Sequence, residues 1–312
     1  MVDAEGSVQV ASPTENTDLY FALRGAGNGN FGVVTQLTIQ MHSVGRRNIG
    51  KELLSFEATV PVDKLPEFSI ALSAMDVPRG FFPIFEGGIM PDLTDPDVEA
   101  LPISFLYTGE DLTEGKIYLK DNIVPLLASM QDNDSAEVEF EMEVLSWYNW
   151  TVESGNFLGN YVRAWTGFLH EENNNIFVWK KIQQAFLKLL RSSPYLMVDV
   201  ELFGGAISDA LPHETAFPHR GAEWNVGLLL LVPAEDPDAM EVFEETVKMV
   251  DAAWSKIQKY FDGVYLNYLM ESLSEEEYPR QYWGSNLDRL MDIKAKYDPQ
   301  NVFHHPQSVP LR

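Results

Sequence analysis

The segment from Gly25 to Gly32 is the part of the sequence best suited to hold a ligand through its backbone, because four of its eight residues are glycine. Glycine adopts positive φ without strain and lets the backbone approach a ligand closely. The spacing differs from the dinucleotide-binding and P-loop patterns, since no helix with the required spacing follows. Composition alone therefore leaves two interpretations, a tight turn and a ligand-binding loop.

Histidine and acidic side chains give little indication of a metal site. His304 and His305 are adjacent, and neighbouring residues of an extended chain point to opposite sides. The acidic clusters 92–99 and 271–277 lack the alternating oxygen ligands and central glycine of an EF-hand loop, so we interpret them as solvated faces. We expect no metal. His219 is a candidate substrate contact, although a lone histidine is more often a hydrogen-bonded surface or core residue.

Aromatic residues gather at Trp147, Tyr148 and Trp150. Their rings could cover a pocket for an aromatic substrate, or they could pack between a sheet and its helices. We take Tyr148 and Trp150 as candidate substrate contacts and keep the packing role as the alternative.

The composition excludes several functional classes. The chain has no cysteine, which rules out disulfides, thiolate ligands, thiol nucleophiles and cysteine-linked cofactors within it. A net charge of −25, from 47 acidic and 22 basic residues, repels nucleic acids and anionic membranes. The longest apolar run, Val226 to Pro233, is far shorter than the roughly 20 residues that span a bilayer. No signal-peptide pattern is present at the N-terminus, and localisation stays open.

Hydrophobic periodicity predicts a mixture of strands and helices. Strand-forming residues, which alternate with polar ones in Glu137–Leu145 and Leu196–Leu202, favour strands there and at Ser7–Ala11, Val33–Met41, Glu52–Val60, Leu101–Tyr107 and Asn225–Val232. Helical spacing occurs at Ile117–Met130, with a bend near Pro125, at Ile176–Leu189 and at Phe243–Phe261. The region between Val77 and Pro102, rich in proline and glycine, is expected to serve mainly as a connection. Because strands and helices do not strictly alternate, we expect an α+β fold with helices on an antiparallel sheet.

Several motifs follow one another in the order of a known family. The segment from Asp18 to Thr35, DLYFALRGAGNGNFGVVT, resembles the DLxxALRGGGxGNFGVVT segment of FAD-linked oxidases related to berberine bridge enzyme. Residues 265–268, YLNY, are similar to the family's Y-x-N-Y, and residues 282–310 resemble its closing motif. Residues 204–207 and 215–220 lie between them in the family's order. The resemblance covers nearly the whole chain.

The resemblance implies a flavin held between an FAD-binding domain and a substrate domain, in which helices back an antiparallel sheet. It divides this chain into three parts. Residues 1–45 would be the C-terminal remnant of the FAD-binding domain, and residues 46–264 would be the substrate domain. Residues 265–312 would form the family's C-terminal segment, which returns to the FAD side.

The resemblance also implies roles for individual residues. Tyr268 would be the catalytic base that takes a substrate hydroxyl proton while hydride leaves for the flavin. Asn267 would contact the flavin, and Gly32 and Val33 would touch it through their backbone. A phenol with a pKa near 10 needs a perturbed environment to act as a base at neutral pH. The alternative is that Tyr268 is a sheet residue with a satisfied hydroxyl. The family often has an acidic residue two positions later, where this sequence has Met270.

Matching residues 2–6 with the family's VxADG strand places Met1 inside the FAD-binding domain. The phosphate-binding loop and the residues that attach the flavin would then lie upstream. We therefore keep three hypotheses. The first is an FAD-dependent oxidase of an alcohol, sugar or secondary-metabolite substrate that uses O2. The second is a cofactor-free descendant that uses the substrate pocket for binding or for a non-redox cyclisation or isomerisation, and the third is an inactive incomplete product. A small-molecule substrate is expected, and the exposed flavin-side face would favour a homodimer or a companion chain.

Overall fold

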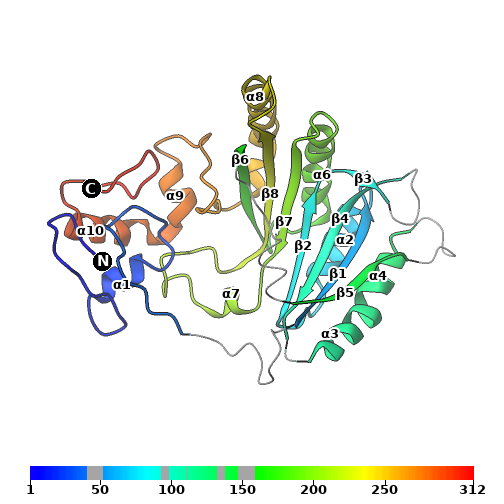
Figure 1. The fold of residues 1–312 in the computed structure, drawn as a ribbon, viewed down its shortest axis with the longest axis horizontal. Helices are drawn as coiled ribbons and strands as arrows, with labels where there is room; N and C mark the ends of the chain where they lie inside the picture. Colours follow the sequence, from blue (N-terminus) through cyan, green and yellow to red (C-terminus); the bar gives the residue numbers. More distant parts are fainter. Residues whose placement is uncertain (41–51, 93–97, 110, 132–137, 147–158) are drawn as a thin grey trace.

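The computed structural model describes residues 1–40, 52–92, 98–109, 111–131, 138–146 and 159–312. Within these residues, one eight-stranded sheet forms the centre of the molecule (Figure 1). Its strands are β1 (Glu52–Pro61), β2 (Phe81–Gly87), β3 (Met90–Pro91), β4 (Glu99–Tyr107), β5 (Glu141–Ser146), β6 (Asn160–His170), β7 (Leu196–Leu202) and β8 (Ala222–Pro233). The order is β5-β1-β4-β2-β7-β8-β6, with β3 beside β4, and every pair is antiparallel. The expected α+β fold with an antiparallel sheet is confirmed.

Helices pack on the sheet and at one end of the molecule (Figure 1). The described helices are α1 (Thr17–Ala22), α2 (Leu65–Ser73), α3 (Leu112–Tyr118), α4 (Val124–Ala128), α6 (Ile176–Leu190), α7 (Ala206–Asp209), α8 (Ala239–Ile257), α9 (Tyr278–Trp283) and α10 (Leu287–Tyr297). Short turns of other helix types are η1 (Leu119–Ile123), η2 (Gln258–Tyr260) and η3 (Gly284–Asn286). Among these described helices, none is long and apolar enough to cross a membrane.

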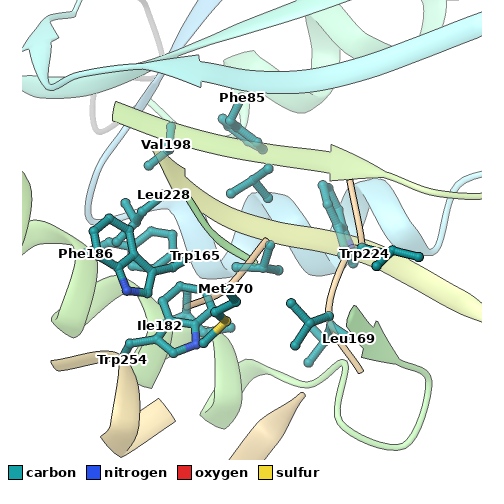
Figure 2. Close-up of a cluster of buried hydrophobic side chains, with 14 of the residues drawn as sticks. Phe85, Trp165, Leu169, Ile182, Phe186, Val198, Trp224, Leu228, Trp254 and Met270 are labelled. Carbon is teal, nitrogen blue, oxygen red and sulfur yellow. The ribbon is translucent and has the colours of Figure 1, made fainter. Parts of the chain in front are cut away.

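The hydrophobic core lies between the sheet and the helices α2, α6 and α8 (Figure 2). Trp224 of β8 meets Trp179 of α6 edge to face, with ring centroids 5.3 Å apart. Phe186 of α6 stacks on Trp254 of α8 at 6.3 Å. Aromatic pairs of this kind bury large apolar areas and prefer these geometries. The residues at helical spacing in the sequence thus form the layer that holds α6 and α8 on the sheet.

The opposite face of the sheet carries polar side chains across its centre. Glu86 of β2 pairs with Asp199 of β7, Asp199 pairs with Gly227 of β8, and Gly227 pairs with Thr166 of β6. Residues directly opposite one another in an antiparallel ladder point to the same face. The register therefore brings carboxylates from separate strands together on the face that lies away from the helical core.

The two ends of the chain pack together beside the sheet, where α1, α9 and α10 lie (Figure 1). The indole of Trp283 donates to the Ala26 carbonyl at 3.2 Å, and Lys296 pairs with Asp18 at 2.7 Å. These contacts connect segments more than 250 residues apart in sequence. The division at residues 45 and 264 remains a prediction.

Most long elements match the periodicity. The strands predicted at 52–60, 101–107, 196–202 and 225–232 appear as β1, β4, β7 and β8. The helices predicted around Phe186 and Val250 appear as α6 and α8. The helix expected to bend near Pro125 is divided into α3, the π-helical turn η1 and α4, in which Pro125 lies in the first turn. A proline there has no N–H to donate to the preceding turn, which favours the change in helix type.

Other predictions of secondary structure were wrong. The stretch interpreted as a connection between residues 77 and 102 contains β2, which lies between β4 and β7. The segments 7–11 and 33–40 contain only isolated bridges, from Val2 to Val8 and from Val2 to Val33. Among the described residues, no extended strand pairs with either segment. Residue 41, where the second of these strands was predicted to end, lies outside the described residues.

Candidate functional site

A buried network of hydrogen bonds holds the glycine loop, residues 25–32, in place. The side-chain amide of Asn30 donates to the Ala26 carbonyl at 3.0 Å, and its oxygen accepts from the Val309 N–H at 2.7 Å. The ammonium of Lys294 donates to the Asn30 carbonyl at 2.7 Å and pairs with Asp298 at 2.6 Å, with both charged side chains fully buried. Buried charges persist when they are paired and hydrogen-bonded in this way. The closing motif of the sequence therefore holds the loop in place.

A cavity of about 820 Å³ opens between this loop and two C-terminal segments. Its walls are Gly27, Asn28, Gly29 and Asn30 of the loop, Leu266, Asn267, Leu269 and Glu271 of the first segment, and His305, Pro306 and Gln307 of the second. The volume lies within the range of small-molecule and cofactor pockets, roughly 300–1,000 Å³.

Glycine is required where the loop approaches the cavity wall. Gly27 has φ of +86°, and a Cβ there would lie 2.9 Å from a methyl carbon of Leu266. Gly29 has φ of +70°, and a Cβ there would meet only His305 at 3.7 Å. The loop therefore packs tightly against the wall at Gly27, whereas a Cβ at Gly29 would make only an ordinary van der Waals contact.

The Tyr265–Tyr268 motif forms a turn between the cavity and the polar face of the sheet. The Tyr268 N–H donates to the Tyr265 carbonyl at 2.9 Å, and the Tyr265 N–H donates to the hydroxyl of Thr166 at 3.0 Å. The exposed amide of Asn267 donates to the Tyr265 hydroxyl at 2.8 Å and lines the cavity. Tyr268 is half-buried and packs edge to face on Tyr265. An ion pair between Arg163 and Glu271 joins the segment to β6.

The surroundings of Tyr268 make its hydroxyl harder to ionise. Burial, followed by the charges of Asp199 and Glu201, raises the pKa of Tyr268 to about 12. Burial and the neighbouring carboxylates of Glu201 and Glu86 raise the pKa of Asp199 to about 7. Desolvation disfavours the charged form of an acid, and like charges add to this effect. Asp199 can therefore exchange a proton near neutral pH, whereas Tyr268 stays protonated there.

Two buried polar atoms on this face have no hydrogen-bond partner among the described residues, Oδ2 of Asp199 and Oδ1 of Asn225. Asp199 is 4% exposed and Asn225 is fully buried. The Asn225 amide nitrogen donates to Glu201 at 2.9 Å, which leaves its oxygen free. Buried polar atoms without partners are costly and mark sites where a ligand or water completes the bonding.

His219 is buried among aromatic rings. Its ring stacks on Phe168 with centroids 4.7 Å apart, and its Nε2 lies 3.1 Å from the Gln281 carbonyl. Burial lowers the pKa of His219 to about 4, so the ring is neutral at physiological pH. His219 does not line the cavity beside the glycine loop. Its position matches that of a core histidine, the alternative given for it above.

The other candidate residues either do not line that cavity or lie outside the described residues. A Cβ on Gly32 would lie 2.3 Å from the Val2 carbonyl, so this glycine allows two backbone segments to pair. Val33 is 55% exposed and bridges to Val2. Neither residue lines the cavity. Tyr148 and Trp150 lie outside the described residues.

The carboxylates beneath Tyr268 were missed as site residues. Their signal in the sequence is the alternation of Asp199 and Glu201 with Val198 and Val200 in a strand. This pattern predicted a strand, which the structure has as β7. It does not show that Tyr268, about 70 residues later, lies over these carboxylates.

Comparison with known proteins agrees with this architecture. The family described as "Berberine and berberine like" matches residues 264–310, the segment that carries Asn267, Tyr268 and Lys294. Xylooligosaccharide oxidase of Thermothelomyces thermophilus is 27% identical over 99% of this chain and 61% of its own length. Chitooligosaccharide oxidase of Gibberella zeae is 24% identical over 97% of this chain and 60% of its own. The chain thus spans about three fifths of the length of these relatives.

The fold is also found in solved structures. BBE-like 1 of Physcomitrella patens superimposes on the whole chain with a TM-score of 0.76, at 24% identity and over 64% of its own length. Chitooligosaccharide oxidase superimposes with a TM-score of 0.77, at 20% identity and over 65% of its own length. The fold and the site define a class of protein in which an antiparallel sheet backed by helices is joined to a C-terminal segment that carries a tyrosine. Residues 264–310 match the berberine-like family, and over nearly its whole length the chain is similar to FAD-linked oxidoreductases.

Proposed function

We propose that this chain forms the substrate side and one flavin-facing wall of an FAD-dependent oxidase that acts on an alcohol, a sugar or a secondary metabolite. The observation that carries the proposal is that one turn, residues 265–268, presents Asn267 to the cavity and Tyr268 to the carboxylates of the sheet. A cofactor on one side and a substrate on the other would then meet at this turn. The relatives named as oligosaccharide oxidases support a hydroxyl-bearing substrate.

The residues that line the cavity suit the ring system of a flavin. The volume of about 820 Å³ is sufficient for a cofactor ring, and the lack of side chains at Gly27 and Gly29 lets the backbone approach it closely. Asn267 would contact the ring through its amide, and the backbone from Gly27 to Asn30 would lie against it. We assign this backbone contact to Gly27–Asn30 in place of Gly32 and Val33, because these four residues line the cavity. When bound, FAD would accept hydride from the substrate carbon and pass the electrons to O2.

We propose that Tyr268 and Asp199 act together to remove the proton of the substrate hydroxyl. The pKa of Tyr268, raised to about 12 by burial and then by Asp199, makes the phenol a weak acid at neutral pH. The pKa of Asp199 is about 7, mainly because of its burial, so its carboxylate form is available above neutrality. Tyr268 would orient the hydroxyl, and the proton would end on Asp199. General bases act best when their pKa is near the working pH.

Turnover of the flavin-containing protein tests these roles. Peroxide formation from a panel of oligosaccharides and alcohols should fall by at least about 100-fold in Tyr268→Phe and in Asp199→Asn, with KM little changed. For the parent protein, kcat should rise with pH through about 7, where Asp199 loses its proton. An unchanged rate in Tyr268→Phe would remove this residue from the mechanism.

The absorbance spectrum of the purified protein separates this function from the alternatives. The visible bands of oxidised flavin, present at useful occupancy, support the oxidase. A colourless, cooperatively folded protein that takes up no added FAD would instead support a cofactor-free binding protein or an inactive product.

A further inference from the structure

The outer surface of the helical layer carries a second cavity, which shares no lining residue with the cavity beside the glycine loop and is unrelated to the proposed oxidase activity. It has a volume of about 510 Å³ and runs along the seam between α6 and α8. Four lysines line it, Lys181, Lys188, Lys256 and Lys259, and none of the described residues that line it is acidic. In a chain of net charge −25, this is a local concentration of positive charge. We call it the lysine groove.

The floor of the lysine groove is apolar. Ala185 of α6 and Ala252 and Ala253 of α8 leave space where larger side chains would close the seam, and Met249 and Leu189 complete the floor. The lining residues extend over about two helical turns on each helix, or roughly 12 Å. The groove thus has the shape and polarity to take a short apolar chain.

Positive charge is concentrated at one end of the groove. Phe177 at the start of α6 packs edge to face on Tyr260, which follows α8, at 6.4 Å. The ammonium of Lys181 lies 5.5 Å from the Phe177 ring centroid, and that of Lys259 lies 5.1 Å from the Tyr260 ring centroid. Two ammonium groups are therefore positioned on a contacting pair of aromatic rings. In the described part of the chain, neither has an ion-pair partner.

Stabilisation of helix dipoles does not account for this arrangement. Lys188 and Lys256 lie in the last turns of α6 and α8, where cations are favourable. Lys181, however, lies in the first half of α6, where the dipole gives a cation no such benefit. Lys180, its neighbour, pairs with Glu67 at 3.3 Å and does not line the groove.

We infer that the lysine groove binds a soluble anionic amphiphile, a single-chain carboxylate whose head group lies between Lys181 and Lys259 and whose chain lies on the alanine floor. The groove is bounded and small, which favours a small molecule over a flat lipid surface. The overall negative charge of the protein also opposes contact with an anionic membrane.

Decanoate below its micelle concentration, titrated calorimetrically into the full chain, tests the inference. Saturable binding at one site is expected, with affinity rising about three- to fourfold for each CH2 added from octanoate to decanoate. The double change Lys181→Gln and Lys259→Gln should weaken binding at least about fivefold, because it removes two ion pairs. Lys180→Gln removes a lysine next to the groove and should bind as the parent does.

A second pair of variants tests the floor. Ala252→Trp places an indole in the groove from an exposed position and should abolish binding, whereas Ser255→Trp, exposed on the same helix and outside the groove, should not. Absence of saturable binding, equal affinity in the double lysine variant, or no dependence on chain length would each overturn the inference. Binding of vesicles of phosphatidylcholine and phosphatidylserine, with no binding of decanoate, would assign the groove to a membrane surface and overturn it as well.

Discussion

Asp199 should make the folded protein less stable as the pH rises, because its carboxyl group is buried on the polar face of the sheet. Its pKa is raised from 3.8 to about 7, first by burial and then by Glu201 and Glu86. The folded state therefore retains a proton that the unfolded state releases. Stability is consequently lost between about pH 4 and pH 7, and no further loss from this group occurs above that interval.

The size of the effect follows from the shift. Three pKa units correspond to about 4 kcal/mol of unfolding free energy. Asp199→Asn removes the titration and keeps the shape of the side chain. The stability of the variant relative to the parent should therefore increase by about 4 kcal/mol between pH 4 and pH 8. Urea unfolding followed by tryptophan fluorescence at the two pH values measures this difference.

A control on the same face of the sheet makes the result specific. Glu57 of β1 is exposed, so Glu57→Gln should change stability by less than about 0.5 kcal/mol at both pH values. If the difference between Asp199→Asn and the parent were the same at pH 4 and pH 8, the buried carboxyl would not titrate as described. Asp199 could then not be the proton acceptor proposed for catalysis.

Three other results are expected. Lys294→Met should destabilise the protein by about 3–5 kcal/mol in urea unfolding, because it leaves the buried Asp298 without its partner; a loss below about 1 kcal/mol would show that the pair does not hold the loop. Gly32→Ala should lower the thermal midpoint by several degrees, since its Cβ would overlap the Val2 carbonyl. Gly6→Ala, with open space around its Cβ, should lower the thermal midpoint less. The His219 ring should titrate by NMR near pH 4, and a midpoint near 6.5 would contradict its burial.

The sequence was informative where a single element carries its own pattern. The apolar spacing of α6 and α8, the alternation in β7 and the apolar run of β8 predicted those elements. β2 was missed because Pro83 and its flanking glycines resemble a loop, yet β4 and β7 pair with it on both sides. Burial between two strands outweighed the local preference.

The site was only partly predictable for a related reason. The resemblance to a family identified Asn267 and Tyr268, and both lie at the boundary between cavity and sheet. The contribution of Asp199 depends on the strand register and on the path of the chain after β8, neither of which a single strand reveals. Val33 shows the opposite case, in which a strand-forming residue is exposed because, among the described residues, it pairs only with Val2.

Flavin binding at the cavity beside the glycine loop is the most direct test of the account. FAD fluorescence, titrated with the protein, should be quenched to saturation at one site. Leu269→Trp, which fills the cavity from an exposed position on its wall, should weaken this binding at least about tenfold. Equal binding by the variant and the parent, or no saturable quenching by either, would contradict the claim that this cavity receives the cofactor.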